Sequence, residues 1–489
     1  MLYRLLCERA ESYPDKIAIA GERRSVTFSQ VHDETTRVAH FLRTDLKLKA
    51  EDPLIIGVPG SPEFCTLFYG AAAIGATAVP VSPSGKIPAP IKAMAPATVA
   101  GDADFLRAVE DAGLTVRGVI VWDRQNGLHL PDRPAALDRR KLIRKERVFA
   151  ASSSGTTGEP TLSFRTAELL ARSWELGPAV YQVAPEDVFL STRLFSPSTA
   201  IWPLAKGGKI VVREKFGRLS MAEAIARERV TILSSGPYFY DLLASIPVDD
   251  SADFSSLRLC FCGGAPLPRA VFDRFYRRFG LRIRQIYAGT QIAPALSYSL
   301  SDSIPEAAGH VTGRFPMAVL DDEGNVMGPG KVGEIVVDVA GVKDTLLRSY
   351  LRRNPRRRGR YLYSGDLGKV DAEGNLYVVG RKGPLIKVGG FRVSPAEVED
   401  VLRSHPGVRE VLVFPVNPGG IKELVGALIV PAGEVTQEEL SRHCAERLEW
   451  FKCPHTIEFR ESLPRNAGGK VLPYLFSSPA GPATGEDDS

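Results

Sequence analysis

Apolar runs of strand length alternate with helical patterns through the first part of the chain, and this alternation restricts the fold more than any other feature. The run LIIGVPG at residues 54–60 is typical of a buried strand, and EFCTLFYGAAAIGA at residues 63–76 is typical of a helix with small residues on its packing face. The runs AVPVSP, FLRAVEDAG and GVIVWD repeat the alternation. Strands that alternate with helices form βαβ units. The sequence therefore predicts an α/β fold with a mostly parallel sheet.

The later part of the chain differs in composition and in its pattern of apolar residues. The stretches GEIVVDVAG and GRYLYSGDLGKVDAEGNLYVVG are rich in strand-forming residues, and DAEGN at residues 371–375 predicts a hairpin turn. Beyond Gly390 the patterns of a helix, two strands and a second helix follow, which predict a compact α+β unit. The C-terminal GPATGEDDS has few apolar residues and is predicted to be disordered.

Composition excludes several classes of protein. The 489 residues carry 62 Lys and Arg against 57 Asp and Glu, and a net charge of +5 is too small to argue for nucleic-acid binding. Glu8 interrupts the N-terminus before a signal-like apolar run develops, and no run of about 18 apolar residues predicts a membrane span. Six scattered cysteines are not a disulfide framework. A cytoplasmic enzyme is the default expectation.

Two cysteines stand close together in LRLCFCGG. A metal site is one interpretation of Cys260 and Cys262. Their alternation with Leu259 and Phe261 favours the other interpretation, a buried strand with both thiols on one face.

The loop at residues 152–158 reads SSSGTTG and is too polar for a core. It is either a flexible linker or a loop whose hydroxyls and backbone N–H groups face an anion. Gly155 and Gly158 permit positive φ and close approach of the backbone to a ligand, and successive N–H groups in such a turn form an anion-binding nest. The GxxxxGK[ST] pattern of P-loop nucleotide hydrolases is absent.

Five further segments accompany this loop along the chain. They are FCGGAPLP (261–268), YAGTQ (287–291), YSGDLG (363–368), GRKGPLIKVGGFRVSPAEVE (380–399) and LPRNAGGK (463–470). Together and in this order, the six segments resemble the adenylate-forming superfamily of acyl-CoA synthetases, aryl-CoA ligases, luciferases and peptide-synthetase adenylation domains.

The resemblance implies a fold in two parts. A large N-terminal α/β domain, with β-sheets, packed helices and a small β-barrel-like part, is expected over residues 1–382. A smaller mobile α+β domain is expected over residues 383–476, followed by a disordered tail at 477–489. The change in residue pattern along the chain, from alternating strands and helices to a β-rich part and an α+β unit, agrees with this division.

The resemblance also implies a reaction. A carboxylic acid is joined to the α-phosphate of ATP with release of pyrophosphate, and the acyl-AMP is then attacked by a thiol. The first step brings two anions together, so it needs charge neutralisation and positioning, which fixed donors, a lysine and Mg²⁺ supply.

Nucleotide-binding residues are carried over from the matching motifs. The loop that would hold the β- and γ-phosphates consists of Ser153, Ser154, Gly155, Thr156, Thr157 and Gly158. Gly264, Ala265 and Pro266 would lie along the adenine, with Tyr287 on its other face.

The remaining nucleotide contacts are assigned a chemical role each. Thr290 would contact the α-phosphate. Asp366 would accept hydrogen bonds from the ribose hydroxyls, a role that suits a carboxylate at a turn. Arg381 would approach the ribose and phosphate. Lys470 would reach the α-phosphate and the attacking carboxylate oxygen.

Four positions depart from the family pattern. Thr161 stands where the family's loop usually has lysine, and Ser196 follows Phe195 where many members have histidine after an aromatic residue. Gln291 replaces the glutamate that helps to hold Mg²⁺, which leaves Gln291 and Thr157 as weak neutral ligands. Gly383 occupies the hinge position, commonly Asp or Lys. A slow or specialised ligase is one interpretation; the other is a protein of this fold that performs one half-reaction, or that only binds nucleotide.

The acid pocket is expected to favour an aryl or medium-length acyl acid, because it combines aromatic and small residues. Its predicted lining is Phe195, Ser196, Trp202, Ser235, Gly236, Phe261, Gly263 and Ile292.

The expected acceptor is a phosphopantetheine thiol, either on CoA or on a separate acyl carrier protein, with its arm along Lys387, Gly389 and Gly390. The basic run RRNPRRRGR (352–360) is either a solubilising surface loop or an attractor for an acidic carrier or the CoA phosphates.

Overall fold

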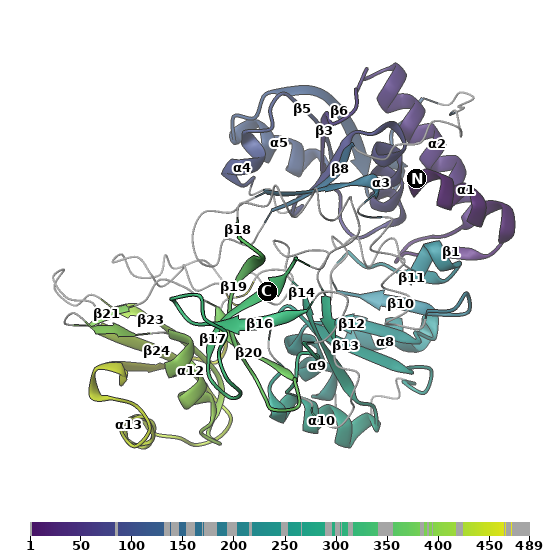
Figure 1. The fold of residues 1–489 in the computed structure, drawn as a ribbon. Coiled ribbons are helices and arrows are strands. Elements are labelled where there is room, and N and C mark those ends of the chain that lie inside the picture. Colours follow the sequence, from purple (N-terminus) through teal and green to yellow (C-terminus); the bar gives the residue numbers. More distant parts are fainter. Residues whose placement is uncertain are drawn as a thin grey trace. The chain divides into compact units, whose positions relative to one another are not determined.

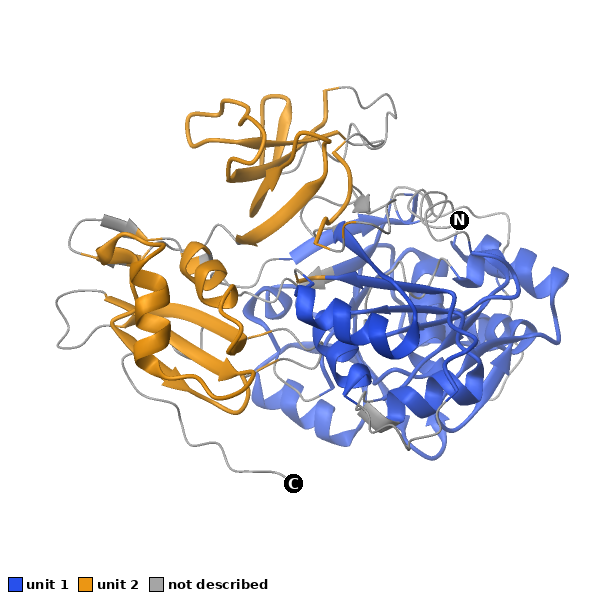
Figure 2. Ribbon diagram, turned by 90° about the horizontal axis from the view of Figure 1, so that it is seen from below, with its two compact units in different colours: residues 1–154, 160–263, 267–294 blue, residues 155–159, 264–266, 295–489 orange. Residues whose placement is uncertain are grey.

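A computed structural model describes most of the chain. The described residues are 2–83, 87–131, 137, 146–152, 162–168, 170, 183–192, 203–214, 218–245, 253–265, 267–288, 296–298, 304, 306–311, 316–340, 356–381, 386–388, 391–393, 395–416, 424–463, 465 and 471. They form two compact units (Figure 2). Unit 1 comprises residues 1–154, 160–263 and 267–294, and unit 2 comprises residues 155–159, 264–266 and 295–489. The predicted boundary at residue 383 falls within unit 2 and stays a prediction.

The first sheet of unit 1 has the predicted parallel core. Its strand order is β7-β6-β5-β3-β4-β8-β9, in which β6, β5, β3, β4 and β8 run parallel. The strands are β3 (Pro53–Gly57), β4 (Thr77–Pro80), β5 (Ala97–Gly101), β6 (Val116–Asp123), β7 (Gly127–Leu128), β8 (Arg147–Ser152) and β9 (Leu162–Thr166). The helices that connect or precede them are α1 (Leu2–Ser12), α2 (Phe28–Thr44), α3 (Pro62–Ile74), α4 (Ala89–Lys92) and α5 (Ala103–Asp111) (Figure 1).

The part of the second sheet that lies in unit 1 runs in the order β14-β13-β12-β10-β11-β1-β2. All of these neighbours are parallel except β1 and β2. The strands are β1 (Ile17–Ala20), β2 (Ser25–Thr27), β10 (Val188–Ser191), β11 (Lys209–Val211), β12 (Ile232–Ser235), β13 (Leu259–Gly263) and β14 (Ile283–Ala288). A core on one face joins them to α8 (Arg218–Glu228), α9 (Pro237–Ala244) and α10 (Arg269–Phe279).

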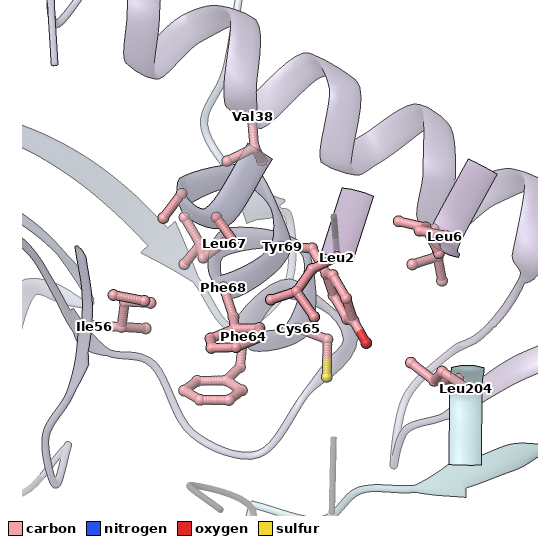
Figure 3. Packing of buried hydrophobic residues seen from close by; sticks show 14 of the residues in the cluster. Leu2, Leu6, Val38, Ile56, Phe64, Cys65, Leu67, Phe68, Tyr69 and Leu204 are labelled. Atoms are coloured by element: carbon pink, nitrogen blue, oxygen red, sulfur yellow. The ribbon is translucent and has the colours of Figure 1, made fainter. Parts of the chain in front are cut away.

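Helix α3 is buried on nearly all sides, and not on one packing face as its small residues suggested. Of the residues of this helix, Ala73 alone is partly exposed. Its side chains share one core with α1, α2 and strands of both sheets, as Figure 3 shows for Phe64 and Phe68 beside Ile56. A helix that is apolar all round belongs in the interior. The helix therefore joins the two sheets of unit 1.

Phe105 packs against two glycines on neighbouring strands of the first sheet. A Cβ at Gly57 would lie 2.4 Å from the Phe105 ring, and one at Gly101 would lie 2.3 Å from it. Phe105 is fully buried in the core beneath α5. The two glycines therefore let the ring lie directly on the sheet.

This packing predicts a stability defect in Gly101→Ala. The added methyl group meets a ring that is enclosed by core, so the free energy of unfolding should fall by about 1–3 kcal/mol. Denaturant titration measures this, with Gly113→Ala as a control because no atom lies within 4 Å of a Cβ at Gly113. The control has its own cost, since Gly113 has φ +69. A Gly101→Ala variant no less stable than that control contradicts the packing argument.

Unit 2 contains the β-rich segment that the sequence predicts. After β15 (Leu296–Tyr298), an antiparallel sheet is formed by β16 (Met317–Leu320), β17 (Gly333–Asp338), β18 (Arg357–Arg358), β19 (Tyr361–Val370) and β20 (Leu376–Arg381). The hairpin turn predicted at residues 371–375 is confirmed. Asp371 Oδ1 accepts a hydrogen bond from Asn375 N at 2.7 Å, and Gly374 has φ +86.

The predicted succession of helix, two strands and helix is also confirmed in unit 2. The elements are β21 (Ile386–Val388), β22 (Phe391–Val393), α12 (Pro395–Arg403), β23 (Val408–Val416), β24 (Leu424–Pro431), α13 (Gln437–Ala445), η1 (Trp450–Lys452) and β25 (Thr456–Phe459). They share a core that includes Val398, Leu402, Ile429 and Leu440. The tail at 477–489 lies outside the described residues. Among the helices of the described ranges, none has the length and apolar character that a membrane crossing requires.

Candidate functional site

The structure describes part of the predicted site. The described residues are Ser235, Gly236, Phe261, Gly263, Gly264, Ala265, Tyr287, Asp366 and, for their backbone, Arg381 and Lys387. The others lie outside the described residues: Ser153, Ser154, Gly155, Thr156, Thr157, Gly158, Phe195, Ser196, Trp202, Pro266, Thr290, Gln291, Ile292, Gly383, Gly389, Gly390 and Lys470.

In unit 1, the carboxyl ends of three neighbouring parallel strands carry the predicted acid and adenine contacts. Ser235 at the end of β12 pairs with Cys262 of β13, and Gly263 of β13 pairs with Ile286 of β14, one residue before Tyr287. Ligands of open α/β sheets bind outside the carboxyl ends of the strands. The sheet thus brings these predicted residues to one edge.

The side chains at the base of this edge are already engaged. Ser235 is 2% exposed, and its Oγ lies 2.9 Å from Thr192 Oγ1. Tyr240, on α9, donates its hydroxyl towards Leu233 O at 3.1 Å and Phe261 O at 2.8 Å. Phe261 itself is buried in the core between the sheets. Ser235 and Phe261, two residues of the predicted pocket lining, are therefore fixed within β12 and β13 by these contacts.

A residue that the sequence analysis missed bonds to the backbone just after residues 264–266, the segment predicted to lie along the adenine. Gln285 is 4% exposed, and its Oε1 accepts a hydrogen bond from Leu267 N at 2.9 Å. Gly264 has φ +84, which glycine adopts without the steric cost of a Cβ. The sequence does contain a signal for the role of Gln285, because a polar residue stands at a buried position of β14, between Ile283 and Tyr287.

In unit 2, Asp366 lies in a β-bulge. Along the β17–β19 pair, residues 334–336 of β17 face residues 363–367 of β19. Ile335 is therefore opposed by the whole Ser364–Asp366 segment, and Gly365 has φ +78. Bulges next to active sites re-aim a side chain. The YSGDLG segment, taken from sequence as a turn, is a bulge within a strand.

Arg381 is the cross-strand neighbour of Asp366. The two residues pair between β20 and β19, and residues directly opposite in an antiparallel pair have Cβ atoms about 4.5–5.5 Å apart. The two residues predicted to contact the ribose are therefore adjacent in unit 2.

The described residues that flank Lys470 are held in place. Arg465 forms an antiparallel bridge with Val471 and an ion pair with Glu410. Leu463 is 3% exposed in a small core with β23 and β24. The described residues on either side of 466–470 are therefore anchored in unit 2.

The predicted thiol-channel segment is part of a tight hairpin. Lys387 pairs with Arg392, and Val388 pairs with Phe391. Only Gly389 and Gly390 separate the last paired residues, which is the length and composition of a two-residue hairpin loop.

The basic run is partly a strand. Arg357 and Arg358 form β18 and pair with β19. Arg360 is ion-paired with Asp338, and Arg356 Nη1 donates to Ser364 O at 3.3 Å. In its described part, residues 356–360, the run is thus tied to the sheet that carries Asp366.

The strand interpretation of the cysteine pair is confirmed. Cys260 and Cys262 are buried in β13, and burial raises the pKa of the Cys260 thiol to about 12. Across the described ranges, no group of three or more His, Cys, Asp or Glu side chains could hold a metal ion.

Curated proteins similar to this chain are CoA ligases. The long-chain-fatty-acid–CoA ligase FadD13 of Mycobacterium tuberculosis is 30% identical over 478 residues, which cover 91% of this chain and 92% of that protein. The 2-succinylbenzoate–CoA ligase of Bacillus mycoides is 28% identical and covers 96% of both chains.

Solved structures share the fold. The anthranilate CoA ligase AuaEII in complex with anthranoyl-AMP superposes with a TM-score of 0.82 at 23% identity, over 97% of this chain and 96% of that one. A fatty acyl CoA synthetase of Mycobacterium tuberculosis does so with a TM-score of 0.71 at 26% identity, over 97% of both.

Family models match both parts of the chain. The AMP-binding enzyme model matches residues 6–350, and the model of the AMP-binding enzyme C-terminal domain matches residues 397–470. The first match alone covers more than half of the chain. The chain therefore belongs to the AMP-binding enzymes, the adenylate-forming superfamily that its six motifs indicated.

Proposed function

We propose that the chain is an ATP-dependent carboxylic acid–thiol ligase whose thiol substrate is CoA. The carboxylate oxygen attacks the α-phosphorus of ATP, the bond from that phosphorus to the bridging oxygen breaks, and pyrophosphate leaves. The deprotonated thiol then attacks the acyl carbon, and AMP leaves with the electron pair of the broken C–O bond. The observation that most supports this proposal is the similarity to two CoA ligases, over 91% and 96% of this chain.

The nucleotide contacts follow the motif assignment. Residues 153–158 bind the β- and γ-phosphates, residues 264–266 and Tyr287 enclose the adenine, and Thr290 contacts the α-phosphate. Asp366 and Arg381 bind the ribose, and their pairing across β19 and β20 supports a shared ligand. Lys470 neutralises negative charge where the substrate carboxylate approaches the α-phosphate. A charge that is already in position is most effective in this role.

The acid is an aryl or medium-length acyl carboxylate. The names of the relatives span fatty acids, 2-succinylbenzoate and anthranoyl-AMP, so the family alone does not select among them. The buried Phe261 supports an apolar surface for such a group, and Ser235 beside it is already hydrogen-bonded to Thr192.

CoA is the acceptor and a separate carrier protein is the alternative. Both present the same phosphopantetheine thiol, which would run along the Lys387–Gly390 hairpin. The CoA ligase names of the relatives favour CoA. We expect the ligase in the cytoplasm, where both ATP and CoA are supplied.

ATP–pyrophosphate exchange with a range of acids tests this function. Acid-dependent exchange identifies adenylation and the acid together, and thioester formation with CoA or with a carrier protein then identifies the acceptor. Absence of exchange with every acid, combined with tight AMP binding, would instead support a non-catalytic nucleotide-binding protein. That alternative is favoured only by the loss of a carboxylate at Gln291.

Mg²⁺ binding is expected to be weak in this chain. Its candidate ligands, Gln291 and Thr157, offer neutral oxygens, whereas Mg²⁺ is usually bound through one or two carboxylates and the substrate phosphates. When bound, the ion supplies charge neutralisation on those phosphates. Gln291 and Thr157 would therefore hold the ion only together with the phosphates of ATP.

We predict that Gln291→Glu lowers the Mg²⁺ concentration that gives half-maximal exchange rate, because a charged oxygen suits the ion better. The measurement is a Mg²⁺ titration of ATP–pyrophosphate exchange, with Gln291→Ala as the control that removes the amide oxygen. An unmoved or higher Mg²⁺ requirement in Gln291→Glu would mean that other groups hold the metal.

A further inference from the structure

The β-bulge at Ser364–Asp366 is held by two contacts to β17. Ser364 Oγ donates to Ile335 O at 2.6 Å and accepts from Asp366 N at 3.0 Å. The Ser364 hydroxyl thus links Ile335 O of β17 to Asp366 N of β19. The side chain of Ser364 is buried, at 4% exposed. It ties the backbone of Asp366 to β17.

Glu334 holds the apex of the bulge. Gly365 is buried, and its N–H donates to Glu334 Oε1 at 3.1 Å. A buried N–H in a bulge has lost its ladder partner, so this acceptor satisfies it, and a carboxylate makes the bond charge-assisted.

A glycine at this point needs such a restraint. Gly365 has φ +78 and can adopt several other backbone conformations at little cost. Rotation about the backbone bonds of Gly365 would turn the direction in which the Asp366 side chain leaves the strand. The Glu334 bond fixes the peptide on the N-terminal side of Gly365, and the bond from Asp366 N to Ser364 Oγ fixes the peptide on its C-terminal side, so the two bonds together oppose that rotation.

We propose that Glu334 is a positioning residue that aims the Asp366 carboxylate and thereby sets the preference of the site for ribose over deoxyribose. The proposal rests on the proposed role of Asp366 at the ribose. Glu334 acts from the neighbouring strand through Gly365, and Ser364 assists from the same side of the bulge.

Nucleotide-binding measurements test this assignment without requiring the acid. Dissociation constants for AMP, 2′-deoxy-AMP and 3′-deoxy-AMP are determined by calorimetry for the native chain and for Glu334→Ala. We expect the native chain to prefer AMP. In Glu334→Ala, AMP binding should weaken about tenfold, because a misaligned Asp366 loses about one charge-assisted hydrogen bond to the ribose, and the ratio between AMP and either deoxynucleotide should fall towards one.

Three further variants separate positioning from stability. Glu334→Gln keeps an acceptor oxygen and should retain the preference for AMP. Ser364→Ala should lose it, and carries the test if Glu334→Ala does not fold. Glu323→Ala, an exposed glutamate of the same unit, should leave all three dissociation constants unchanged.

Each outcome decides a separate point. If Glu334→Ala or Ser364→Ala melts at a lower temperature but keeps the native ratio, the bulge contacts are only structural and the proposal is wrong. If the native chain binds AMP and both deoxynucleotides equally, the assignment of Asp366 to the ribose is wrong. If the native chain binds no AMP, the proposed function itself fails, and the inference with it.

Discussion

Acid-dependent pyrophosphate release is expected to fall by about 10²–10³-fold in Lys470→Ala, the cost typical of losing one fixed donor to a developing charge. The lysine is assigned to the meeting point of two anions, the attacking carboxylate and the α-phosphate. Arg465 and Val471, which flank it in the sequence, are joined by a β-bridge that does not involve the lysine side chain, so the substitution should remove the charge without breaking that bridge. Thioester formation from a supplied acyl-AMP should be retained.

The two half-reactions are measured separately in this variant. Pyrophosphate release reports adenylation, and CoA thioester formation from synthetic acyl-AMP reports thiolation. Lys331→Ala is a matched control, because Lys331 is an exposed lysine of the same unit. Native pyrophosphate release in Lys470→Ala would refute the assignment of this lysine.

Gly383→Pro is expected to retain one half-reaction and lose the other. Lys470 and the Lys387–Gly390 hairpin both belong to the predicted mobile domain, and the two steps require different faces of it. A hinge absorbs a large φ/ψ change at a few residues, and glycine does so with the least steric cost. Proline fixes φ near −65° and would follow directly into Pro384, so the domain would be locked in one orientation.

The control for this hinge prediction is Gly383→Ala, which removes the glycine but leaves φ rotatable. It should keep both half-reactions at measurable rates, whereas Gly383→Pro should keep only one. Pyrophosphate exchange and thioester formation from synthetic acyl-AMP are followed in both variants. A parallel loss of the two activities in Gly383→Pro, or no loss, shows that residue 383 is not the pivot.

Local patterns predicted the architecture well. The strand at residues 54–60 and the following helix are β3 and α3, because period and length depend on neighbours in sequence. The turn at 371–375 was predictable for the same reason, since Asp371 bonds to residues only a few positions away. Full burial of α3 was less evident, because it depends on a second sheet formed by distant strands.

The supporting contacts of the site were not predictable from local patterns. Gln285 and Leu267 are 18 positions apart, and Glu334 and Gly365 are 31 apart. Each bond joins a side chain to the backbone of another element, so no period or spacing reveals it. Motif resemblance identified Asp366 and Arg381, whereas only the strand register shows that they are opposite each other.

The bulge also limits how the length of this segment can vary. Two residue steps on β17 face four on β19, so the bulge adds an even number of residues. Because side chains alternate along a strand, an even addition leaves Leu367 to Val370 on their own faces of the sheet. Deletion or insertion of a single residue between Tyr363 and Leu367 would change the class of the bulge and re-aim the Asp366 side chain. The length of this segment is therefore fixed by the direction that Asp366 must take.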